Sequence, residues 1–136
     1  MSPVKAARLD DEAEAPFALP EVDRGEPMPL HEQVAASIRR AIAEGEAKAG
    51  ERIPQAKDLA AVLGVNTNTV LRALHLLRDE GLLEMGRGKA IRVTGDAEQG
   101  AVVVKAKELI TLARRNGYRS EELVDLMQTL LKERWV

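Results

Sequence analysis

The chain has 136 residues, of which 45% are apolar and only 2% aromatic, and it has no cysteine. This length suffices for one buried core with an appendage, and it excludes a large ligand-binding domain beside a first domain. The lack of cysteine excludes a disulfide framework, a thiolate zinc site and a cysteine nucleophile. A core built from Leu, Val, Ile and Ala is typical of packed helices, so we expect a mainly α fold.

The formal net charge of −2 is unevenly distributed along the chain. Residues 1–26 carry three basic and seven acidic side chains (−4), residues 27–95 carry ten and eight (+2), and residues 96–136 carry seven of each. The central segment therefore has the sign that favours DNA phosphate. No apolar run approaches the roughly 20 residues that span a bilayer, and no secretory pattern opens the chain, so we expect a cytoplasmic protein without membrane contact.

The first 26 residues combine acidic side chains with prolines and show little periodicity, which predicts that most of this segment is a mobile arm. A first helix is expected from Pro29, with Gly45 near its end. On this helix Arg39 and Arg40 are expected to point away from the apolar stripe. The stripe consists of Leu30, Val34, Ile38, Ala41 and Ile42.

A helix-turn-helix is predicted in the middle of the chain. A brief extended segment at residues 52–53 precedes a second helix over about residues 55–63. Gly64 interrupts that helix, and Asn66 is suited to accept hydrogen bonds from the free amides that open a third helix over about residues 67–80. Val70, Leu74 and Leu77 lie at i, i+4 and i+7 on the inner face of this third helix.

A β-hairpin, or wing, follows, with strands predicted at residues 82–85 and 90–93 around a turn at 86–89. After a polar break at 94–100, amphipathic helices are expected over about residues 101–116 and 120–134, the second capped by Ser120 and the acids after it. The predicted fold class is mainly α with a small β-hairpin, a winged helix-turn-helix followed by a two-helix element. The predicted domains are a flexible acidic arm (1–26), a DNA-binding domain (27–95) and a helical hairpin for dimerisation (96–136).

The start of the third helix carries the side chains that DNA recognition requires. Asn68 can pair bidentately with an adenine edge, Arg72 can reach guanine or phosphate, and threonine methyls can contact thymine. In the wing, glycines permit close backbone approach while basic side chains follow phosphates. The alternative is that these side chains merely cap and solvate a surface helix and a basic hairpin. The candidate DNA-binding residues are Lys57, Asn66, Thr67, Asn68, Thr69, Arg72, His75, Arg87, Gly88 and Lys89.

The order of these motifs resembles the winged-helix domain of GntR-type bacterial regulators. The resemblance covers about residues 27–136, and the N-x-N-T-V-x-R-A string at residues 66–73 with the short two-helix tail is similar to the YtrA subfamily. It implies a DNA-binding transcription regulator, usually a repressor, on an inverted-repeat operator, often controlling a neighbouring transporter operon. Lys57 stands where the family usually has arginine, and the loss of the planar fork puts a base-specific role there in doubt.

In the YtrA subfamily the C-terminal helices dimerise the protein, which implies the same role here. The apolar stripe of the last predicted helix runs continuously from Leu123 to Leu131, and a homodimer would place two recognition helices about 34 Å apart, one turn of duplex. The alternative is that the two helices form an extra layer on the core. The candidate dimerisation residues are Leu109, Leu112, Leu123, Leu126, Met127, Leu130, Leu131 and Trp135.

Other classes of function fit the sequence less well. The isolated histidines and acidic pairs form no catalytic constellation, so we expect no enzyme. His75 and Asp79 lie four residues apart, but a solvated helix face is the more ordinary explanation than a metal site, which usually needs four ligands. The remaining alternative is a winged-helix protein-interaction module without sequence-specific DNA binding. The sequence assigns no cofactor and no small-molecule effector.

Overall fold

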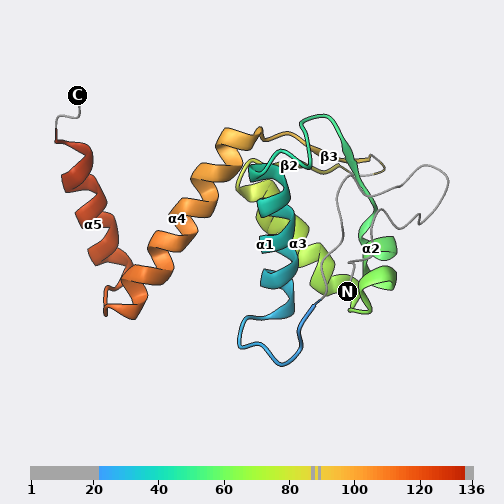
Figure 1. The fold of residues 1–136 in the computed structure, drawn as a ribbon, viewed down its shortest axis with the longest axis horizontal. Coiled ribbons are helices and arrows are strands. Elements are labelled where there is room, and N and C mark those ends of the chain that lie inside the picture. The colour runs from blue at the N-terminus through green and yellow to red at the C-terminus, as the bar shows by residue number, and fades with distance from the viewer. Residues whose placement is uncertain (1–21, 87, 89, 134–136) are drawn as a thin grey trace. The chain divides into compact units, whose positions relative to one another are not determined.

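The computed structural model describes residues 22–86, 88 and 90–133 (Figure 1). The predictions that involve Arg87, Lys89 and Trp135, and most of the acidic arm, lie outside the described residues. The chain divides into two compact units, residues 1–103 and 104–136. Within the described ranges, no helix has the length and apolar character that crossing a membrane requires.

Three helices supply most of the core of the first unit: α1 (Leu30–Ala43), α2 (Ala56–Leu63) and α3 (Thr67–Asp79). Both α1 and α2 pack against α3 (Figure 1). The predicted inner face of α3 is confirmed, because Val70, Leu74 and Leu77 have no exposed surface. Val34, Ile38, Ala41 and Ile42 of the α1 stripe are buried as predicted. The helical periodicity therefore located the core correctly.

Arg39 was expected to point outward, and this was wrong. Its side chain is 6% exposed, and its Nε and Nη2 atoms each donate a 2.8 Å hydrogen bond to a carboxylate oxygen of Glu80. A planar guanidinium paired with both oxygens of one carboxylate can be buried because its charge and donors are matched. This ion pair ties the C-terminal end of α1 to the residue that ends α3.

The sheet has three strands: β1 (Arg52–Ile53), β2 (Leu83–Glu84) and β3 (Ile91–Val93), in the order β1-β3-β2. The predicted hairpin is confirmed, since β2 pairs antiparallel with β3 in the register Leu83 to Val93. The short extended segment before Pro54 becomes β1, which pairs with the other edge of β3 and places Ile53 opposite Ile91. The fold is the predicted winged helix-turn-helix, with its sheet completed by a strand from a distant part of the sequence.

Helix α4 (Ala97–Arg115) begins earlier than predicted, inside the segment taken as a polar break. Asp96 and Gln99 cap its start reciprocally, since each backbone N–H donates to the side chain of the other, at 2.9 and 2.8 Å. Gly100 is buried where a methyl group would lie 3.0 Å from the backbone nitrogen of Ala43. The lack of a side chain at Gly100 therefore lets the backbones of α4 and α1 approach closely, and the glycine does not interrupt the helix. Because of this packing, the first compact unit extends beyond residue 95, where we predicted that the DNA-binding domain ends. The division of the chain into functional domains stays a prediction.

The second unit contains the remainder of α4 and helix α5 (Ser120–Leu131). The start of α5 differs from the prediction, because the capping residue is Arg119, whose backbone N–H donates to Glu122 at 2.8 Å. Ser120 is instead the first helical residue. No residue of α5 is buried, although the helix has a clear apolar stripe.

Candidate nucleic-acid interface

The turn between α2 and α3 sets the direction in which α3 begins. Gly64 ends α2 in the left-handed conformation (φ 71°), a backbone geometry that other residues rarely adopt, and its N–H donates to Ala60 O at 2.9 Å. Asn66 is extended, and its Oδ1 accepts a 2.7 Å hydrogen bond from the N–H of Asn68. The predicted cap is confirmed. The side-chain oxygen of Asn66 is thereby engaged by its own helix, which leaves its amide hydrogens as the donors for a ligand.

Helix α3 has two chemically distinct faces. Val70, Ala73, Leu74 and Leu77 are fully buried against the rest of the unit. On the other side, Asn68, Arg72 and His75 are exposed at i, i+4 and i+7, and therefore follow one another along a single stripe. Thr67 is exposed and Thr69 is half-buried. The buried face holds the helix on the body, while the exposed stripe offers amide, guanidinium and imidazole groups for contact with a partner.

The other predicted site residues lie on separate elements. Lys57 is exposed in the first turn of α2, and Gly88 is exposed in the loop between β2 and β3. Arg87 and Lys89 lie outside the described residues, so the basic character of the wing tip stays a prediction. The structure thus places six of the candidate side chains together at the start and along one stripe of α3, and Lys57 on the neighbouring helix.

The acidic side chain that follows this stripe along α3, Asp79, is engaged by the neighbouring Arg78. Asp79 accepts hydrogen bonds from Arg78 Nε at 3.3 Å and Nη2 at 3.1 Å. Throughout the part of the chain that the structure describes, no three His, Asp or Glu side chains come together as a possible metal site.

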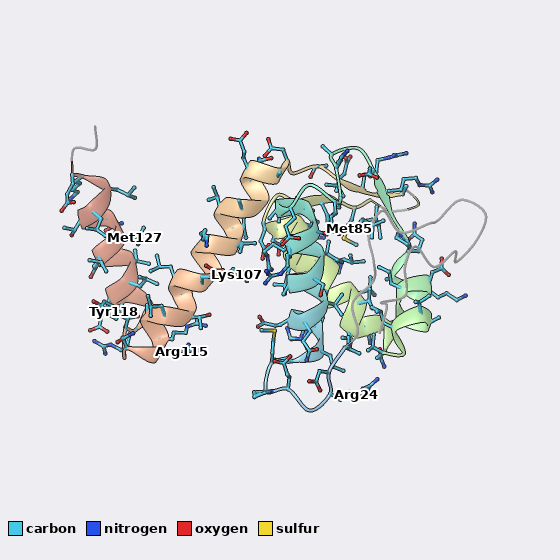
Figure 2. The ribbon with its side chains drawn as sticks, viewed as in Figure 1. Arg24, Met85, Lys107, Arg115, Tyr118 and Met127 are labelled. Carbon is cyan, nitrogen blue, oxygen red and sulfur yellow. The ribbon has the colours of Figure 1, made fainter. Side chains whose placement is uncertain are left out.

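Arg24 is a residue at this site that the sequence did not single out. Its Nη2 donates a hydrogen bond to the carbonyl oxygen of Gly64, in the turn that precedes α3 (Figure 2). Nothing in the sequence pattern connects the two residues, because they are 40 positions apart and Arg24 stands in an acidic segment.

A polar, outward-facing helix start held by a buried face, next to a β-hairpin, defines a winged helix-turn-helix transcription regulator. Residues 30–93 match the family model described as bacterial regulatory proteins, gntR family. The chain is 28% identical over 110 residues to the HTH-type transcriptional repressor YtrA of Bacillus subtilis, covering 76% of this chain and 85% of YtrA. It is 33% identical over 90 residues to the HTH-type transcriptional regulator Rv1152 of Mycobacterium tuberculosis, covering 65% of this chain and 74% of that protein. The chain belongs to the GntR family of DNA-binding transcription regulators.

Two solved structures agree with this assignment. YtrA from Sulfolobus acidocaldarius, a GntR-family transcription factor, matches with a TM-score of 0.54 and 27% identity over 82% of this chain and 96% of that one. The DNA-binding domain of AraR, solved in complex with operator ORX1, matches with a TM-score of 0.50 and 28% identity over 54% of this chain and 95% of that one. Some relatives are longer, and the chain spans only 43% of the regulator SmoD of Agrobacterium fabrum.

Proposed function

We propose that the protein represses transcription in the bacterial cytoplasm as a homodimer bound to an inverted-repeat operator, with α3 in the major groove. The observation that carries this proposal is the division of α3 into a fully buried apolar face and an exposed stripe of Asn68, Arg72 and His75. The operator complex of the AraR domain and the name of the YtrA repressor support it. The family assignment favours a sequence-specific DNA-binding protein over a protein-interaction module. The proposed activity is binding, without a catalytic step.

The residues of the stripe differ in what they can recognise. The Asn68 side chain carries both a donor and an acceptor, which suits the adenine edge, and Arg72 presents a fork that matches the two acceptors of guanine. Thr67 and the half-buried Thr69 offer methyl groups for thymine. The exposed Lys57 on α2 suits a phosphate, because an ammonium is a point charge without a planar fork. We therefore assign base readout to α3 and backbone contact to Lys57 and the wing.

The second unit supplies the proposed dimer interface. Several large apolar side chains of α4 and α5 are exposed, among them Leu131 (74%), Leu112 (58%) and Val124 (53%). Leu109, Leu123, Met127 and Leu130 are half-buried, and Leu126 lies at the border of exposure. Two amphipathic helices that leave so much apolar surface in water are stabilised by association with a second copy, which buries that surface at about 25 cal/mol per Å².

Selection of bound duplexes from a random library tests the DNA-binding part of the proposal. We expect an enriched inverted repeat, because a two-fold symmetric dimer reads two equivalent half-sites. Asn68→Ala and Arg72→Ala should each cost about 1–3 kcal/mol in binding to that duplex and relax preference at one base pair per half-site. Arg78→Ala, an exposed arginine of the last turn of α3, is the control that should preserve preference. Unchanged specificity in the Asn68→Ala, Arg72→Ala double variant contradicts the assignment of α3.

Light scattering coupled to gel filtration tests the dimer. Leu126→Asp combined with Leu131→Asp should convert the dimer to a monomer, because two carboxylates would lose their hydration in an apolar interface. Gln128→Asp introduces the same charge at an exposed polar position of α5 and should leave the dimer intact. A wild-type protein that is monomeric at micromolar concentration contradicts this part of the proposal.

A further inference from the structure

Gln33 makes three hydrogen bonds to the segment that precedes α1. Gln33 of α1 accepts a 2.8 Å hydrogen bond from the N–H of Asp23 and donates from Nε2 to the carbonyl oxygens of Asp23 and Met28, at 2.8 and 2.9 Å. The Asp23 carboxylate in turn accepts a 2.9 Å bond from the N–H of Gly25, and Val22 packs against the core. Residues 22–26 were predicted as part of an arm, but they have a defined path across the first unit.

This path places Arg24 next to the turn of the helix-turn-helix. Its guanidinium donates to the carbonyl oxygen of Gly64, two residues before the cap of α3 (Figure 2). The side chain is exposed, and a guanidinium has five N–H donors in a planar fork, of which this bond uses one. Among the residues that the structure describes, no other acceptor engages this guanidinium, so its remaining donors are available to a ligand at the end of α3 that we propose enters the groove.

The N-terminal end of α3 lacks positively charged side chains of its own, which makes the position of Arg24 significant. The segment from Gly64 to Leu71 contains no basic side chain, and the first one on α3 is Arg72. Phosphates of both strands flank a recognition helix at its N-terminal end, and their neutralisation by arginine and lysine supplies much of the affinity for DNA. Arg24 brings a cation to the location where the helix itself provides only neutral side chains.

We propose that Arg24 is a DNA-contacting residue, which reaches a duplex phosphate from the segment before α1 while its bond to Gly64 orients the guanidinium. This inference rests on the proposed function, since it requires α3 to lie in the major groove. It extends the DNA-binding surface beyond the helix-turn-helix and the wing to a third segment of the chain. The contact carries no base specificity, because phosphates are the same at every position.

The salt dependence of binding tests this proposal with the full-length chain and a duplex selected by the wild-type protein. Arg24→Gln removes the charge and keeps a donor for Gly64, so the slope of log K against log salt should become shallower by about 0.9. Equivalently, the affinity ratio of wild type to variant should shrink about 3.5-fold between 50 and 200 mM salt. Arg24→Lys should retain the slope of the wild type.

Arg40→Gln is the matched control. Arg40 is exposed on α1, next to Arg39. Because Arg39 pairs with Glu80 at the C-terminal end of α3, Arg40 lies far from the N-terminal end of α3. The variant therefore loses the same charge as Arg24→Gln, but at the opposite end of α3. It should leave the slope unchanged. Equal thermal unfolding midpoints for the variants and the wild type confirm that each is folded.

The outcomes separate this inference from the proposed function. If the slope of log K against log salt is the same for Arg24→Gln as for the wild type, the phosphate contact is overturned. This holds also if the affinity of the variant falls by the same factor at every salt concentration, because Arg24 then only positions the turn. Failure of the wild type to enrich any duplex overturns the proposed function and this inference together. A third outcome is that the wild type enriches a duplex, Asn68→Ala loses specificity for it, and Arg24→Gln keeps the salt slope of the wild type. That outcome overturns this inference alone.

Discussion

Helices α3 and α5 are similar in length, 13 and 12 residues, and both carry an apolar stripe at helical spacing. In α3 four residues of the stripe are fully buried, whereas α5 has no buried residue. The pattern of apolar residues therefore identifies a face that needs a partner, but it does not identify the partner. For α3 the partner is the rest of its own unit, and for α5 we propose that it is a second copy of the chain.

The largest effect is expected where α3 ends. Arg39→Met leaves Glu80 without the guanidinium that neutralises it, and removal of one member of a buried ion pair costs about 3–5 kcal/mol. Urea unfolding measures the loss. The Arg39→Met, Glu80→Leu double variant should recover most of it, because an apolar pair of similar volume can replace a buried ion pair. A single variant as stable as the wild type would show that the pair contributes nothing net.

A matched pair of leucines tests the comparison of the two helices directly. Leu74→Ala on α3 should lower the free energy of unfolding by about 2–5 kcal/mol, because it leaves a cavity in a closed core. Leu131→Ala on α5 removes the same atoms from a side chain that is 74% exposed, and it should change the stability of the monomer by less than about 0.5 kcal/mol.

The monomer for this comparison is provided by a Leu112→Asp, Leu126→Asp background, which places two carboxylates in the proposed apolar interface and keeps Leu131. The stability of both variants is measured there by urea unfolding. Similar losses for Leu74→Ala and Leu131→Ala would contradict the distinction between a face satisfied within one chain and a face left open.

A loss smaller than that of Leu74→Ala is expected in α4, whose first turn packs on α1 while its later turns belong to the second unit. Gly100→Ala should destabilise the protein by about 1–3 kcal/mol, since the new methyl group meets the backbone of Ala43. Ala106→Gly, at an exposed position further along the helix, should cost about 1 kcal/mol through helix propensity alone. Propensity by itself predicts a gain for Gly100→Ala, so a measured gain would show that α4 does not pack closely on α1.

The sequence alone predicted the elements whose signals are local. The spacing of Val70, Leu74 and Leu77 predicted the buried face of α3, and Gly64 with Asn66 predicted the turn and cap before it. These features depend on backbone geometry and helical periodicity within a few residues, so they can be recognised without knowledge of the rest of the fold.

Only the tertiary structure decided the contacts between residues distant in sequence. The burial of Arg39 depends on Glu80, 41 positions away, the position of Arg24 depends on Gly64, 40 positions away, and Gly100 is a close contact only because α1 lies against it. Each of these residues has an ordinary local explanation as a surface arginine, an arginine in a polar segment or a helix breaker. Their roles follow from a partner brought near by folding, and no local pattern encodes that proximity.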